Sequence, residues 1–126
     1  MIFVVDTLEY LHRGGRIGGA SRLLGTMLDL KPLLELQEGK VEALERIRTK
    51  RKAINRLVDI MEERVNGTGR IRLAALHASM EDEARALLDE IDLRCCPIET
   101  IFTEVSPVLG THTGPGTVGL AYYTGP

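Results

Sequence analysis

Apolar residues recur at helical spacing through the second half of the chain. The clearest series begins at residue 54 and consists of Ile54, Leu57, Val58, Met61 and Val65. Steps of three and four residues place these side chains on one face of a helix, which is the pattern of a helix packed on a core. Thr49 precedes the series as a predicted N-cap, and the polar glycine-containing stretch 66–69 follows it. The pattern therefore predicts an amphipathic helix over about 49–65.

A second helical stripe follows, and apolar runs stand on both sides of it. Its members are Ala84, Leu87, Leu88 and Ile91. Ser79 is the predicted N-cap of this helix. The runs 71–76 and 98–105 have the length and the apolar content of strands. This half of the chain therefore alternates strand, helix and strand.

The first half predicts shorter elements. A strand at 2–5 leads into a short helix that carries Leu8 and Leu11, with Asp6 or Thr7 as its cap and Gly14–Gly15 at its end. A helix is also predicted over about 21–28, and Pro32 marks a stop. Strands at 33–36 and 40–47 are joined by 37–39 as a hairpin. Near the C-terminus we expect a glycine-rich loop over 110–119, followed by a short strand at 120–123.

This order of elements predicts the fold class. Alternating strands and helices with one hairpin indicate a single layered α/β domain over residues 1–126. We expect a mixed β-sheet, partly antiparallel, that is flanked by helices.

Composition narrows the function classes. The 126 residues are 44% hydrophobic and 27% charged, with a formal net charge of −2. A slightly acidic chain with few aromatic residues is not typical of nucleic-acid-binding domains. No apolar run approaches the ~18–20 residues that cross a bilayer, and no signal peptide is evident at the start, so a cytoplasmic protein is expected. The adjacent pair Cys95–Cys96 predicts neither a disulfide nor a metal site, and we interpret both as packing residues.

The most unusual segment is Gly110-Thr-His-Thr-Gly-Pro-Gly-Thr-Val-Gly119. Glycines let a backbone approach a ligand closely, and the imidazole of His112 and the hydroxyls of Thr111 and Thr113 can donate hydrogen bonds to an anion. A tight turn with a surface histidine is the alternative. The glycine spacing also matches a dinucleotide motif, but no helix and no acidic residue follow it at the required distance, so we reject that interpretation and predict no cofactor.

Two basic segments are further candidates. Arg16 follows Gly14–Gly15, where it could face an anion or simply complement a helix end. Residues 46–56 contain a basic cluster that includes Arg48, and the alternatives are a phosphate or nucleic-acid patch and a solvated helix face. Motifs typical of serine hydrolases and zinc proteases are missing from the sequence.

Taken in order along the chain, these segments resemble the bacterial DegV family of fatty-acid-binding proteins. The matching stretches are 6–17, 28–32, 39–50 and 110–116, namely Asp-Thr-Leu-Glu-Tyr-Leu-His-Arg-Gly-Gly-Arg-Ile, Leu-Asp-Leu-Lys-Pro, Gly-Lys leading to Arg-Thr-Lys, and Gly-Thr-His-Thr-Gly-Pro-Gly. Each stretch alone is weak, whereas the ordered set is specific. The resemblance covers essentially the whole chain and corresponds to the C-terminal domain of the family, without its N-terminal domain.

The resemblance implies a carrier rather than an enzyme. DegV-type proteins bury one long-chain fatty acid between two domains, and some present it to a fatty acid kinase. On that basis His112 lies near the fatty-acid carboxylate, supported by Thr111, Thr113 and Gly114. Arg16 and Arg48 lie near the mouth, towards the kinase or the phosphoryl group. Because the N-terminal domain supplies direct carboxylate contacts in the family, this chain would be a truncated, incomplete half of the carrier.

Three other functions stay open at this point. The chain could be a self-association module, as a homodimer formed through the face that the missing domain would cover. It could be a small enzyme that acts on an anionic substrate through His112. Nucleic-acid binding through residues 46–56 is the weakest of the three.

Overall fold

The computed structural model describes residues 1–21, 23, 31–66 and 69–124. Its sheet has six strands in the order β3–β2–β1–β6–β4–β5. The strands are β1 (Ile2–Val4), β2 (Leu33–Gln37), β3 (Lys40–Glu45), β4 (Ile71–His77), β5 (Glu99–Glu104) and β6 (Val118–Thr124). Among these, β4 and β5 are parallel and the other neighbours are antiparallel. The predicted mixed sheet in a single α/β domain is therefore confirmed.

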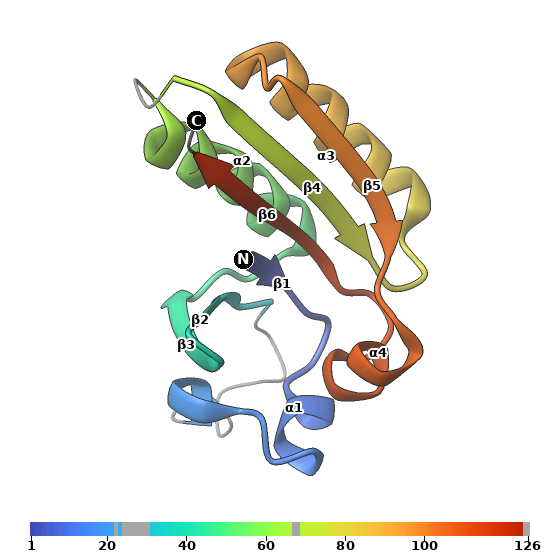
Figure 1. Ribbon diagram of the computed structural model, residues 1–126. Helices are drawn as coiled ribbons and strands as arrows, with labels where there is room; N and C mark the ends of the chain where they lie inside the picture. Colours follow the sequence, from blue (N-terminus) through green and yellow to red (C-terminus); the bar gives the residue numbers. More distant parts are fainter. Residues whose placement is uncertain (22, 24–30, 67–68, 125–126) are drawn as a thin grey trace.

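Among the described residues, four helices accompany the sheet: α1 (Glu9–Arg13), α2 (Lys50–Val65), α3 (Glu81–Cys95) and α4 (Pro107–Thr113). The two long helices, α2 and α3, lie side by side behind the sheet, while α1 and α4 lie next to each other beyond the carboxyl ends of β1 and β4 (Figure 1). The predicted helix at 21–28 falls largely outside the described residues, and residues 18–21 form a 3₁₀ turn.

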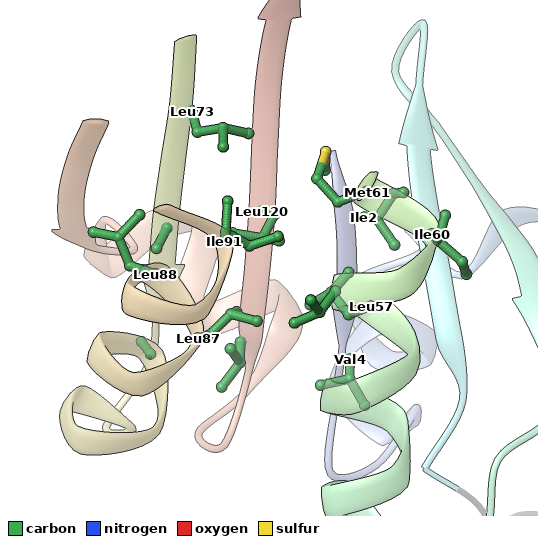
Figure 2. Packing of buried hydrophobic residues seen from close by; sticks show 14 of the residues in the cluster. Ile2, Val4, Leu57, Ile60, Met61, Leu73, Leu87, Leu88, Ile91 and Leu120 are labelled. Carbon is green, nitrogen blue, oxygen red and sulfur yellow. The ribbon is translucent and has the colours of Figure 1, made fainter. Parts of the chain in front are cut away.

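The main core forms between the sheet and the two long helices. Leu57 and Met61 of α2 and Leu87 and Ile91 of α3 point towards the strands, as Figure 2 shows. Each such side chain contributes roughly 1.5–3 kcal/mol when it is removed from water. Both predicted stripes are confirmed, except that Ile54 is only half-buried.

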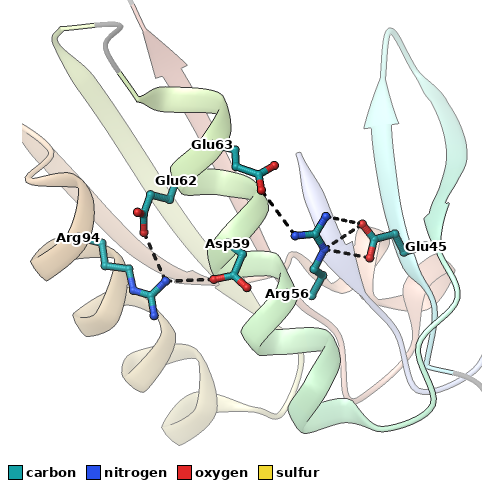
Figure 3. Close-up of polar contacts among 6 residues, drawn as sticks. All are labelled: Glu45, Arg56, Asp59, Glu62, Glu63 and Arg94. Carbon is teal, nitrogen blue, oxygen red and sulfur yellow. Dashed lines mark hydrogen bonds and ion pairs between the residues drawn. The ribbon is translucent and has the colours of Figure 1, made fainter.

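Ion pairs tie the outer surface of these helices together (Figure 3). Arg94 of α3 reaches Asp59 of α2 at 3.1 Å, and Arg56 of α2 binds both carboxylate oxygens of Glu45 at the end of β3 at 2.9 Å. The first pair joins α3 to α2 and the second joins α2 to β3, and because these side chains are partly exposed each pair adds little to stability.

Local signals explain the hairpin and the start of α2. Glu38 and Gly39 connect β2 to β3 with φ values of +53° and +79°, which is the geometry of a type I′ turn. The hydroxyl of Thr49 accepts a hydrogen bond from the backbone N–H of Lys52 at 3.2 Å, which confirms the predicted cap. β3 ends at Glu45, two residues before its predicted end.

The predicted N-cap of α3 is wrong. Ser79 adopts φ +60° and its side chain does not cap the helix, which has Met80 at the cap position. Nδ1 of the buried His77, at the end of β4, instead accepts the backbone N–H of Met80 at 3.1 Å. His77, at the end of the preceding strand, thus takes the place of a cap residue next to the helix. Sequence spacing did not identify this cap, because spacing considers only the residues directly before the helix.

The predicted loop at 110–119 is also wrong in its first part. Residues 110–113 belong to α4, which begins at Pro107, and a proline is well suited to the first position of a helix. Gly114 follows in the left-handed region with φ +85°, which ends the helix.

Both cysteines were predicted to be packing residues, and this prediction is wrong for Cys96. Cys95 is half-buried against the main core, and burial raises the pKa of its thiol above the ordinary value. Cys96 is exposed, because it ends α3 in the left-handed conformation with φ +49°.

The cap of α3 yields a stability prediction. His77→Ala removes both the acceptor for the Met80 N–H and the ring that lies 5.2 Å from the Phe102 ring. We expect the free energy of unfolding to fall by about 2–4 kcal/mol in urea denaturation.

Ser79→Gly is the matched control. It should leave this free energy unchanged or raise it by up to about 1 kcal/mol, because glycine favours φ +60°. A loss of stability in Ser79→Gly with none in His77→Ala would contradict this assignment of the cap.

Candidate functional site

A cavity of about 400 Å³ lies between the helical pair α1–α4 and the β1–β3 half of the sheet. Its size is within the range of ligand pockets for small organic molecules. Fourteen residues line it: Met1, Phe3, Leu11, Gly15, Arg16, Gly18, Gly19, Leu36, Gly39, Lys40, Val41, Glu42, His112 and Thr113. The lining thus combines apolar side chains with polar ones, which come from the α1–α4 end and, as Lys40 and Glu42, from β3.

The polar end gathers residues that are far apart in the sequence. His112 and Thr113 come from α4, whereas Arg16 follows the end of α1. Thr113 is buried, Arg16 is exposed, and His112 is half-buried with a fully buried Nδ1. This Nδ1 has no hydrogen-bond partner among the described residues. A Cβ placed on Gly14 would lie 2.5 Å from this atom, so Nδ1 faces the end of α1 and the rest of the ring contributes to the cavity lining.

The apolar wall is a second core of the protein. Successive residues of β1 point to opposite faces of the sheet, so Ile2 and Val4 enter the main core while Phe3 faces the cavity. Leu36 and Val41 are cross-strand partners on β2 and β3 and lie further along the same wall. The cavity thus runs from the α1–α4 end towards the hairpin.

A glycine lets the chain close over this wall. Gly18 has φ +52°, and a Cβ placed on it would lie 2.6 Å from the backbone oxygen of Val41. A side chain at this position would therefore push the 18–21 turn away from β3 and widen the cavity.

The segment after α4 is fixed firmly to the sheet. The hydroxyl of Thr117 donates to the backbone oxygen of Gly114 at 2.8 Å, and the N–H of Gly116 donates to the oxygen of Ala78 at 2.8 Å. Lys50 adds an ion pair to Asp6 at 2.7 Å and also contacts the backbone oxygen of Gly116. These contacts hold the carboxyl end of α4 in a defined position, and with it His112.

The other sequence-predicted site residues lie outside the cavity lining. Thr111 is exposed on α4, and Gly114 packs on the ring of Tyr10 rather than on the cavity. Arg48 is exposed in the connection between β3 and α2. Their roles towards a ligand or a partner stay predictions.

The apolar wall was not predicted as part of a site. Phe3, Leu36 and Val41 belong to strands whose pairing brings them together, and only the hairpin between Leu36 and Val41 has a local signal. Tyr10, which contacts the end of α4, lies in the predicted short helix and in the matching stretch 6–17, but no role was predicted for it.

A larger groove of about 820 Å³ lies between α2 and α3, on the other side of the sheet. Its lining includes Asp59, Glu90 and Arg94, which pair with one another. We take the smaller cavity as the candidate site, because it joins the imidazole of His112 to an apolar wall.

Within the described residues, no three histidine, cysteine or carboxylate side chains come together as a metal site. Over the same residues, none of the helices has the length and apolarity that a membrane span requires.

Comparisons with known proteins identify relatives along the whole chain. Residues 1–125 match the model of an uncharacterised protein family, DegV family COG1307. A DegV domain-containing protein of Streptomyces coelicolor is 45% identical over 119 residues, which are 94% of this chain and 42% of that protein. Protein DegV of Bacillus subtilis is 33% identical over 120 residues, 95% of this chain and 43% of its own length. The chain thus spans less than half of these relatives.

Solved structures agree with this assignment. A DegV family protein from Thermus thermophilus, described for its fatty acid binding, has a TM-score of 0.91 and 44% identity over 98% of this chain and 44% of its own. DegV of Bacillus subtilis, described as a fatty acid binding protein, has a TM-score of 0.81 and 33% identity over 96% of this chain and 43% of its own. The expected family is therefore confirmed: this chain belongs to the DegV family.

Proposed function

We propose that the chain binds a long-chain fatty acid in the cavity between α1–α4 and β1–β3. The observation that carries the proposal is a cavity that combines the imidazole of His112 and the buried Thr113 with an apolar wall. The fatty acid binding described for the relatives from Thermus thermophilus and Bacillus subtilis supports it.

The cavity suits a fatty acid because polar residues line it near α4 and apolar residues line its wall. The carboxylate lies near His112 and Thr113. Both side chains can donate hydrogen bonds to its oxygens, and hydrogen bonds to a charged acceptor are strong. The acyl chain lies along Phe3, Leu36 and Val41. Burying ~14 methylene groups at ~0.8 kcal/mol each contributes roughly 11 kcal/mol before the costs of binding. The tail therefore supplies most of the affinity, and the head-group residues fix the orientation of the acid.

The proposed role is that of a carrier in the cytoplasm. The chain holds the acid without chemistry of its own and presents it to a fatty acid kinase. Because the chain spans less than half of its relatives, the remainder of such a protein would complete the site.

Fatty acid binding is tested with the purified chain. Organic extracts analysed by mass spectrometry should contain a C14–C18 fatty acid in stoichiometric amount. His112→Ala should weaken the binding of added palmitate roughly ten- to hundredfold, because it removes a hydrogen bond to a charged group.

Leu36→Trp should abolish binding by filling the cavity, while Leu93→Trp adds the same side chain at an exposed site on α3 and should not. If neither extracted nor added fatty acid binds, or if both tryptophan variants behave alike, the proposed site is wrong.

Presentation to the kinase is tested through the predicted arginines. With a bacterial fatty acid kinase, ATP and palmitate-loaded protein, Arg16→Ala and Arg48→Ala should each slow acyl phosphate formation roughly tenfold, because a guanidinium no longer binds the phosphoryl group or the kinase. Arg46→Ala is the matched control, since Arg46 is an exposed arginine in the same segment as Arg48. Equal rates for the Arg46 and Arg48 variants would contradict a role for Arg48.

Self-association is the second candidate function, and one surface favours it. The face of β6, β4 and β5 away from α2 and α3 carries no helix in Figure 1. Ala121, Ala74 and Ile101 are direct neighbours across these strands, and Tyr123 lies on the same face. Ile101 and Tyr123 are 53% and 58% exposed, which is unusual for large apolar side chains within a sheet.

A homodimer through this face is the expected result. Size-exclusion chromatography with light scattering should give twice the monomer mass for the parent chain. Ile101→Glu should give a monomer, because it places a charge within the apolar face. Leu93→Glu alters an exposed leucine on α3 instead and should stay dimeric. A parent chain that is monomeric at high concentration would rule out this function.

A further inference from the structure

The helices α1 and α4 contact each other through two reciprocal contacts between an aromatic ring and a glycine. A Cβ placed on Gly14, just after α1, would lie 2.5 Å from Nδ1 of His112 and 3.3 Å from its Cε1. A Cβ placed on Gly114, just after α4, would lie 2.8 Å from Cε2 of Tyr10. The ring of each helix therefore lies on the terminal glycine of the other, and we call this pair of contacts the ring–glycine interlock.

Packing, rather than hydrogen bonding, therefore fixes the His112 ring on its Nδ1 side. Nδ1 is buried against Gly14 and has no partner among the described residues. The position of the ring consequently depends on how closely α1 approaches α4. On α1, Tyr10 and Gly14 are four residues apart and lie on one face, so a single helix face makes both contacts.

Among the described residues, different contacts hold the segment after α4 and the end of the helix itself. Gly116 and Thr117 bond to Ala78 after β4, and Lys50 contacts the backbone oxygen of Gly116, while the Tyr10 ring packs on Gly114. Removal of the Tyr10 ring would leave Gly114 without that support and let α4 shift relative to Gly14. Such a shift moves His112 at the polar end of the cavity.

We infer that Tyr10 and Gly14 are positioning residues of the ligand site, which hold His112 in the orientation that receives a carboxylate through the ring–glycine interlock. Neither residue needs to touch the ligand for this role. The inference rests on the proposed function, because it adds to the fatty acid site the residues that act through His112.

Gly14→Ala is a clean probe of the interlock. Gly14 has φ −82° and ψ 0°, which alanine adopts without strain. Its added methyl group would press on the His112 ring at 2.5 Å, whereas its next neighbour, the backbone oxygen of Tyr10, lies 3.4 Å away. Tyr10→Ala removes the other contact, and Tyr10→Phe keeps the ring. Gly110→Ala is the matched control on α4, because its Cβ would meet only Val105 at the ordinary distance of 3.5 Å.

The first measurement needs no ligand. The Cε1–Hε1 signals of His12, His77 and His112 are followed by NMR and assigned with His112→Ala. Gly14→Ala and Tyr10→Ala should shift the His112 signal and leave those of His12 and His77 in place. Tyr10→Phe and Gly110→Ala should leave all three in place. An unmoved His112 signal in Tyr10→Ala would overturn the inference, whether or not the chain binds fatty acid.

The second measurement is palmitate binding in a double-mutant cycle. Tyr10→Ala and Gly14→Ala should each weaken binding roughly ten- to hundredfold, and Tyr10→Phe should restore it. In the background of His112→Ala, Tyr10→Ala should cause no further loss, because it acts through the imidazole that is already gone. Additive losses would overturn the inference. If the parent binds no palmitate, the proposed function fails while the NMR result still decides the interlock.

Discussion

The pairing of β1 with β6 is the interaction on which the rest of the structure depends. Ile2, Phe3 and Val4 pair with Leu120, Gly119 and Val118, and this contact joins the hairpin half of the sheet to the half formed by β6, β4 and β5. The alternation of β1 then builds two cores at once, since neighbouring residues face opposite sides. A slip of one residue in this register would exchange the two faces, and so exchange the residues of the main core with those of the cavity wall.

The candidate site follows from that arrangement and from the position of α4. The wall of the cavity is set by strand register, whereas its polar end is set by a short helix that contacts the sheet mainly through residues 114–117. Under the proposed function, affinity for the acid and its orientation would thus depend on different parts of the structure. The sheet face supplies apolar area, and the α1–α4 pair supplies directed donors. Changes in the helical pair would alter where the head group lies while leaving most of the buried area intact.

Much of the fold could be predicted because its signals are local. The stripes of α2 and α3, the Thr49 cap and the Glu38–Gly39 turn are each encoded within a few residues. The cap of α3 could not be predicted in this way, because His77 reaches Met80 from the end of a strand. Helix α4 was not predicted because glycine and threonine have low helix propensity, and its contacts with α1 override that preference. For the site, His112, Thr113 and Arg16 were predicted as candidates. Phe3 stands in no motif and Tyr10 stands within the stretch 6–17, but the contacts of both depend on tertiary packing.

Gly119 connects the two surfaces to which separate functions are assigned. A Cβ placed on it would lie 2.9 Å from Cβ of Phe3 and 3.2 Å from Cδ1 of Leu76. Gly119 on β6 therefore lies between Phe3 of the cavity wall and Leu76 of the uncovered sheet face. Leu76, Ala74 and Ile101 continue that face to the edge strand β5. A surface that covers this face would therefore also reach the wall of the cavity beside Phe3. If both proposed functions hold, association on the open face and retention of a buried acyl chain would be coupled, because one covering surface would remove both from water.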